Sequence, residues 1–195
     1  HILMTLHGEQ PEGATVWEFD EELHAKNRRD WNKWASRALS AERRDELRKM
    51  TDSEGEPRFA EDELAPHDEQ EFAALEAVFA QTFAKRNIDL DFLKMPLLGD
   101  TYDLRQLRFN RLFIVHDYIF LGEEAMFIDS CFERDADLGG VIFHERIDFT
   151  GAEFSGHTNF SGAEFRHGSS FVKTTFSGTI TFSRASFFDQ TNLTG

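Results

Sequence analysis

The sequence has one cysteine and no long apolar stretch. The lone Cys131 excludes an intramolecular disulfide bond and is typical of proteins in a reducing compartment, so we expect a cytoplasmic protein. A membrane-spanning helix needs about 18 apolar residues in a row. The longest candidate, residues 112–121, is interrupted by His116 and Asp117. The sequence therefore predicts no membrane span in this chain.

Basic residues are also scarce. The chain has 21 lysines and arginines against 36 aspartates and glutamates, which gives a formal net charge of −15 at pH 7. Residues 132–195 hold eight acids and five bases, so −3 of this charge lies there and −12 lies before them. A surface that binds nucleic acid needs basic side chains to neutralise phosphates. Direct nucleic-acid binding is therefore not expected.

Phenylalanine, in contrast, is abundant and regularly placed. From Phe127 onward a bulky apolar residue recurs at spacings that alternate between five and six, so the period is eleven residues. Neither an α-helix nor an ordinary alternating strand has this period. A fixed short period predicts a solenoid whose coils share one interior. We expect these sites to form a structural core stack, not a functional site: Phe127, Phe132, Leu138, Phe143, Phe149, Phe154, Phe160, Phe165, Phe171, Phe176, Phe182, Phe187 and Leu193.

A second column of residues supports this grid. Two positions before each site from Phe132 onward stands a small or β-branched residue: Ser130, Ala136, Val141, Ile147, Ala152, Thr158, Ala163, Ser169, Thr174, Ile180, Ala185 and Thr191. Residues two apart in an extended chain point to the same side. Glycine, serine and threonine often follow the large residue, and they favour turns. The small and the large residue of each unit are thus both predicted to face inward.

These units resemble the pentapeptide-repeat family, whose units centre on leucine or phenylalanine. The resemblance is carried by AEFSG at 152–156, AEF at 163–165 and ADL at 136–138, and it covers residues 127–195. It implies a right-handed, four-sided β-helix. An extra residue in every second unit would lengthen a four-sided coil to 22 residues, and a flattened two-sided coil of eleven residues is the alternative. Because sites 11 or 22 residues apart return to equivalent faces, we expect Phe160 and Phe171 to stack in one column.

The first half of the chain reads as helical, so the predicted fold class is α+β: a helical region over 1–100, a transition over 101–126 and the β-helix over 127–195. We interpret residues 1–3, before Met4, as a remnant of cloning. Apolar residues at helical spacing from Trp17 predict a first helix. Ser40 is a candidate cap for a second that ends near Met50, and a third is predicted over 68–86 with Phe72, Leu75, Val78, Phe79 and Phe83 on one stripe. Residues 51–66 read as a solvated loop.

The start and the end of the solenoid are less regular in what they predict. Extending the grid backward from Phe127 reaches the polar His116 and Asn110, so we expect strict register to begin at Phe127 and residues 104–126 to form an imperfect first coil that the helices cover. The grid runs undiminished to Leu193. We expect either truncation of a longer protein, which we favour, or an end-to-end homodimer to cover that end.

The sequence predicts no catalytic, cofactor-binding or metal-binding residues. The eight histidines form no HExxH motif, and His144, His157 and His167 are 13 and 10 residues apart, which are not multiples of eleven. Cys131 has no histidine within ten residues to activate it. Asp52, Glu54 and Gly55 resemble part of a calcium loop, but the first ligand position of such a loop would fall on Met50.

The function predicted is that of a non-enzymatic protein-interaction or scaffold module, bacterial and cytoplasmic, with a protein partner that the sequence does not name. The family resemblance implies one alternative, a DNA-mimic inhibitor of DNA gyrase with an acidic surface. An acid precedes the core site at Asp137, Asp148, Glu153 and Glu164, but serine or threonine replaces it at Ser170, Thr175, Thr181 and Ser186. This fading stripe argues against the mimic. A third alternative is an enzyme whose catalytic residues lie in the helical half.

Overall fold

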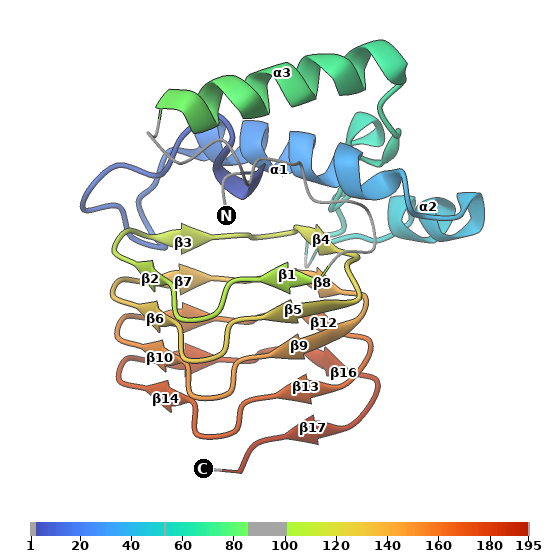
Figure 1. Ribbon diagram of the computed structural model, residues 1–195. Helices are drawn as coiled ribbons and strands as arrows, with labels where there is room; N and C mark the ends of the chain where they lie inside the picture. Colours follow the sequence, from blue (N-terminus) through green and yellow to red (C-terminus); the bar gives the residue numbers. More distant parts are fainter. Residues whose placement is uncertain (1–2, 53, 86–100, 195) are drawn as a thin grey trace.

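The computed structural model describes residues 3–52, 54–85 and 101–194, and the helices in it lie together on one end of a parallel β-helix (Figure 1). The predicted α+β architecture, helices followed by a β-helix, is confirmed. The helices are η1 (Leu3–Thr5), α1 (Glu21–Ser36), α2 (Ala41–Arg48), η2 (Glu61–Leu64) and α3 (Glu69–Lys85). Among the described residues, none of these helices has both the length and the apolar character that crossing a membrane requires.

The β-helix is built from short strands, four to a coil, in four parallel sheets. The sheets have the orders β1-β5-β9-β13-β17, β2-β6-β10-β14, β3-β7-β11-β15 and β4-β8-β12-β16. The strands are β1 (Tyr102–Asp103), β2 (Arg108–Phe109), β3 (Phe113–Ile114), β4 (Ile119–Phe120), β5 (Glu124–Met126), β6 (Cys131–Phe132), β7 (Ala136–Asp137), β8 (Ile142–Phe143), β9 (Arg146–Asp148), β10 (Glu153–Phe154), β11 (Thr158–Asn159), β12 (Glu164–Phe165), β13 (Ser169–Ser170), β14 (Thr175–Phe176), β15 (Ile180–Thr181), β16 (Ser186–Phe187) and β17 (Thr191–Asn192).

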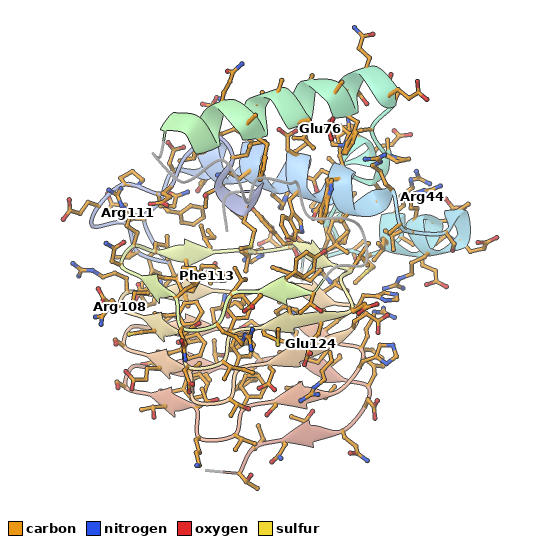
Figure 2. The ribbon with its side chains drawn as sticks, viewed as in Figure 1. Arg44, Glu76, Arg108, Arg111, Phe113 and Glu124 are labelled. Carbon is orange, nitrogen blue, oxygen red and sulfur yellow. The ribbon has the colours of Figure 1, made fainter. Side chains whose placement is uncertain are left out.

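The register of the sheets decides between the two coil shapes. Phe154 pairs with Phe132 on one side and with Phe176 on the other, so each coil from the second onward takes 22 residues. The four-sided coil is therefore correct and the two-sided alternative is wrong. Within a coil, residues of the grid face inward and the residue before each faces outward, as Phe113 and Arg108 illustrate on neighbouring strands (Figure 2).

The first coil is more regular than the sequence indicates. Phe109 pairs with Phe132 and Ile119 with Ile142, at a separation of 23 residues, whereas Ala125 pairs with Ile147 at 22. One extra residue therefore lies between β4 and β5. It displaces the grid by one position, so that the core sites of the first coil are Leu104, Phe109, Val115 and Phe120. The expectation that strict register begins at Phe127 was wrong for this reason: pairing in register already begins at Tyr102.

The interior is a set of aromatic columns with a repeat of one coil. Phe132 and Phe154 stack with ring centroids 4.4 Å apart and planes 2° apart, and Phe160 stacks on Phe182 at 5.0 Å and 4°. Phe160 and Phe171 are both buried but meet edge to face, at 5.8 Å and 88°. The predicted stack of these two residues was wrong, because eleven residues are half a coil and place the second ring on the opposite wall. Offset stacks and edge-to-face contacts are both favourable geometries for aromatic pairs.

The burial of the grid falls off along the solenoid. Sites from Phe127 to Phe171 are at most 4% exposed, Phe176 and Phe182 are partly buried, and Phe187 and Leu193 are 41% and 69% exposed. The last two sites were predicted to belong to the core stack. They are exposed because no described coil packs beneath them.

The helices differ from their predicted bounds mainly at the first one. α1 begins at Glu21 because the carboxylate of Asp20, in an extended conformation, accepts the N–H of Leu23 and caps the helix. Trp17 therefore lies in the preceding loop and is 76% exposed. Ser40 caps α2 as predicted. On α3, Leu75 and Phe79 are buried and Val78 is exposed, while Arg86 and the side chain of Phe83 lie outside the described residues.

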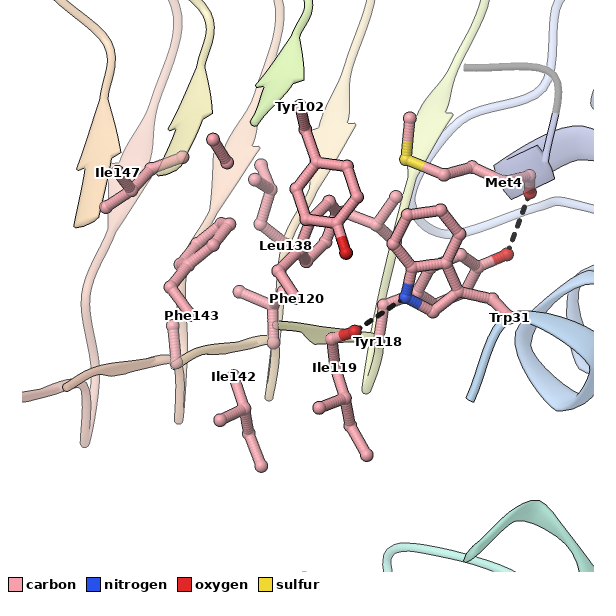
Figure 3. Packing of buried hydrophobic residues seen from close by; sticks show 14 of the residues in the cluster. Met4, Trp31, Tyr102, Tyr118, Ile119, Phe120, Leu138, Ile142, Phe143 and Ile147 are labelled. Atoms are coloured by element: carbon pink, nitrogen blue, oxygen red, sulfur yellow. Dashed lines mark hydrogen bonds between the residues drawn. The ribbon is translucent and has the colours of Figure 1, made fainter. Parts of the chain in front are cut away.

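The helices cover the open edge of the first coil, and we call them the cap. The indole Nε1 of Trp31 donates to the carbonyl of Ile119 at 2.7 Å, and the side-chain amide of Asn32 accepts from the N–H of Ile119 and donates to the carbonyl of Asp117, both at 3.0 Å. The hydroxyl of Tyr118 donates to the carbonyl of Met4 at 3.0 Å (Figure 3). These bonds satisfy backbone groups that an uncovered edge would leave unpaired.

The cap also covers one side of the solenoid. Ile119 and Ile142 stand one position before a core site and so point out of the interior (Figure 3), yet both are buried. α2 lies beside this part of the solenoid in Figure 1. The cap therefore covers the outer face of β4 and β8 as well as the top of the first coil.

We expect Phe160→Ala to lower the free energy of unfolding by about 3–5 kcal/mol, because a fully buried ring that stacks on Phe182 is replaced by a cavity. Thermal or denaturant unfolding measures the change. Phe188→Ala, at a position that is 62% exposed, is the matched control and should change stability little. A loss below about 1 kcal/mol for Phe160→Ala would contradict the packing described here.

We expect Asn32→Ala to destabilise the protein by about 2–4 kcal/mol, because the N–H of Ile119 and the carbonyl of Asp117 would then be buried without partners. Asn192→Ala, at an exposed position, is the control. Denaturant unfolding compares the two. Equal stability of both variants would show that water can replace the Asn32 amide at the edge.

Candidate functional site: a groove beneath the cap

A groove of about 540 Å³ opens where the cap overhangs the solenoid. Thr51, Asp52 and Arg58 form its upper rim. The wall below belongs to the corner between the sheets that start with β3 and β4, and it is lined by His116, Asp117, Gly140, Ser161, Gly162, Glu164, Ser183, Arg184 and Ser186. Concave sites at the junction of two structural units are preferred places for binding. This groove is therefore our candidate functional site.

The floor of the groove is a column of residues with a left-handed backbone. Asp117, Gly140, Gly162 and Arg184 occupy the same corner in four coils, with φ between +57° and +68°. A Cβ at Gly140 would lie 2.8 Å from Nη2 of Arg58, so glycine is needed where the guanidinium approaches. A Cβ at Gly162 would meet only Gly140, at 3.9 Å, so the groove is open at that level.

Arg58 joins the cap to the wall of the groove. Its Nη2 donates to Oδ1 of Asp117 at 3.0 Å and to the carbonyl of Gly140, and its Nη1 lies 3.8 Å from Oε1 of Glu164. Arg28 of α1 approaches Oδ2 of Asp117 at 3.6 Å from the other side and binds Glu63 at 2.8 Å. Because these groups are largely buried, loss of one partner would leave an uncompensated charge.

The prediction that residues 51–66 form a solvated loop was wrong for part of this segment. Phe59, Glu63 and Leu64 are buried, and the side chain of Arg58 is 11% exposed. The sequence did carry a signal, since Arg58 and Phe59 are a basic and an aromatic residue in an otherwise acidic stretch. Asp52 accepts the N–H groups of Glu54 and Glu56, so its carboxylate serves a turn.

His116 and Asp137 form a buried pair beside the groove, with Nδ1 and Oδ2 3.3 Å apart. Burial acts to lower the pKa of His116, but the hydrogen bond and the charge of Asp137, together with Asp117, raise it above its usual value. Burial acts to raise the pKa of Asp137, but His116 and hydrogen bonds from Gly139 and Asn159 hold it below its usual value. The pair is thus an ion pair in which both partners keep their charge.

The acids that precede core sites do not form an open negative stripe. Asp137 and Asp148 are both 6% exposed, and Asp148 accepts the N–H of Thr150 and pairs with Arg146. Glu164 pairs with Arg166 at 2.7 Å. Three of the four acids on which the DNA-mimic alternative depended are therefore used inside the protein.

Other polar residues singled out in the sequence lie apart from the groove, except His116. His144 and His167 do come together on the surface, with ring centroids 6.4 Å apart and Glu145 between them. Spacing by elevens missed this contact because residues 23 apart lie one position out of register on neighbouring coils. Within the described ranges no group of three or more His, Cys, Asp or Glu side chains could hold a metal ion. Cys131 is a free, partly buried thiol on β6.

We expect Asp137→Asn to lower the pKa of His116, because burial, the largest single influence on that pKa, would then be opposed mainly by Asp117. A pH titration followed by NMR of the His116 ring measures the change. Asp148→Asn is the matched control, since Asp148 is equally buried one position before a core site but bonds Thr150 and Arg146. An unchanged His116 titration in Asp137→Asn would contradict the pairing.

Comparison with known families places the solenoid. The family model described as pentapeptide repeats (9 copies) matches residues 138–186, and the region before the solenoid has no family match. No curated protein and no solved structure matches the chain. The match agrees with the four-sided coils, the inward Phe columns and the small residues two positions before them. Through these coils, one corner of which forms the wall of the groove, the chain belongs to the pentapeptide-repeat family.

Proposed function

We propose that this protein is a non-enzymatic protein-interaction or scaffold module and that a partner docks in the groove beneath the cap. The observation that carries the proposal is the junction itself. Arg58 of the cap and Asp117 of the first coil, far apart in sequence, are held together by a buried ion pair, and the groove is the space that their contact leaves open. A binding surface that is fixed before the partner arrives loses little conformational entropy on association.

The chemistry of the groove suits an extended polar segment of a partner protein. Ser161, Ser183 and Ser186 offer hydroxyl groups that both donate and accept hydrogen bonds. They stand on neighbouring coils, which repeat about every 4.8 Å, and glycine keeps the floor low. Asp52 at the upper rim and Arg184 at the lower end give the groove opposite charges at its two ends. The groove would thus select both sequence and direction of a bound segment.

Two features argue against an enzyme. The acids and bases at the groove are engaged with one another, as Arg58 with Asp117 and His116 with Asp137 are, which keeps them from poised proton transfer. The serines of the wall have no adjacent histidine in hydrogen-bond contact among the described residues. Recognition without chemical change fits these groups better.

Exposed apolar residues at the far end suggest a second contact. Phe187, Phe188 and Leu193 are all more than 40% exposed. An end-to-end homodimer, or more repeats in a longer protein, would remove them from water. Such an arrangement would leave the groove free, because the groove lies under the cap at the other end.

We expect Ser183→Trp to abolish partner binding, because an indole on the wall would fill the groove without entering the core. Ser177→Trp is the matched control: Ser177 also follows a core site and is exposed, but it does not line the groove. The measurement is affinity purification with quantitative mass spectrometry, followed by titration with each purified partner. Partners should bind the wild type and Ser177→Trp alike and bind Ser183→Trp at least about tenfold more weakly, a change of about 1.4 kcal/mol.

Retention of every partner by Ser183→Trp would overturn the proposal for the groove. A gyrase supercoiling assay with the same three proteins tests the DNA-mimic alternative separately. We expect no inhibition at micromolar protein, and inhibition by all three proteins would favour the mimic.

A further inference from the structure

A second, smaller cavity lies between the N-terminal segment, α1 and the first coil. Its volume is about 90 Å³, and it is lined by residues 4–5 and 8–10, by His24 and Asn27 of α1, and by residues 108–115 and Tyr118 of the first coil. Met4, Leu112, Phe113 and Val115 give it apolar walls. The groove proposed for partner binding shares none of these residues.

Several polar side chains around this cavity are already paired. Asn27 accepts the N–H of His7 and donates to the carbonyl of Gly8. Gln10 bonds both backbone groups of Asp20, and the hydroxyl of Tyr118 donates to Met4. These bonds hold the N-terminal segment against α1 and the first coil.

His24 is different. It is 8% exposed, and neither of its ring nitrogens has a hydrogen-bond partner among the described residues. The ring stacks on Tyr118 at 5.8 Å and meets Phe19 edge to face at 5.9 Å, so neighbouring rings fix its orientation. A buried polar group without a partner is uncommon and costs stability.

The charge state of His24 limits what could pair with it. Burial lowers the pKa of His24 to about 4, and the charges of Arg28 and His116 act in the same direction, while Asp137 and the backbone of His116 raise it less. At neutral pH the ring is uncharged and offers one N–H donor and one bare nitrogen acceptor. A partner that both accepts and donates a hydrogen bond would therefore match it.

We propose that this cavity binds a small neutral alcohol, whose hydroxyl group hydrogen-bonds His24 and whose apolar body lies against Met4, Leu112, Phe113 and Val115. The size follows from the volume: an engineered apolar cavity of about 150 Å³ holds benzene, so a cavity of about 90 Å³ suits a shorter molecule such as a butanol. A cationic ligand would be repelled by Arg28, and an anionic one would face the negative charge of the helical half. Bound there, the alcohol would join the N-terminal segment to the solenoid.

The test uses the whole chain and 1-butanol as the probe, with diethyl ether as the control. The two are isomers, but the ether cannot donate a hydrogen bond to the bare ring nitrogen. We expect NMR signals of the His24 ring to shift saturably with butanol, and the affinity for ether to be at least about tenfold lower. His24→Leu should remove the saturable response, and His144→Leu, at a partly exposed histidine, should keep it.

Each result decides the matter. A His24 signal that does not move, or that shifts linearly without saturation, would show that the cavity holds water only. Equal binding of butanol and ether would show that the His24 nitrogens recognise nothing. If His24→Leu fails to fold, the butanol and ether titrations of the wild-type protein still separate the outcomes.

Discussion

The contact on which the structure most depends is the one between Asn32 and the edge of β4. A parallel β-helix presents unpaired N–H and C=O groups at each end, and an uncovered end can pair with other chains. The side-chain amide of Asn32 binds the N–H of Ile119 and the carbonyl of Asp117, which is the place a peptide group of a preceding coil would take. Trp31 supplies the next donor. Two neighbouring residues of α1 thus substitute for a missing strand and fix the cap on the solenoid.

The position of the groove follows from how far the cap extends down the solenoid. In the sheet that starts with β4, the residue before each core site is Ile119, then Ile142, Glu164 and Ser186. The first two are buried, whereas Glu164 and Ser186 line the groove. The change from isoleucine to polar residues marks where apolar cover ends. The same column of positions therefore binds the cap in its upper half and forms the recognition wall in its lower half.

The repeat itself could be predicted from the sequence, because each core site must fit an identical environment and the spacing of the Phe residues records it. One extra residue between β4 and β5 was enough to hide the first coil, since the grid then reached His116 and Asn110 instead of Val115 and Phe109. The groove could not be predicted. Arg58 and Asp117 are 59 residues apart, and nothing local marks them as a pair. His24 lay unremarked on α1, because only the folded chain shows that its ring nitrogens lack partners.

The two kinds of position in each coil explain why recognition lies at the corner. Inward positions are constrained by ring stacking, as between Phe165 and Phe187 at 4.6 Å, and a change there alters the whole column. Outward and corner positions, such as Ser183 and Arg184, meet few neighbours and can change without affecting the fold. A solenoid alone would present these positions as a nearly flat wall. The overhang of the cap turns that wall into a concave site, so the helical region supplies shape and the solenoid supplies the side chains that the shape exposes.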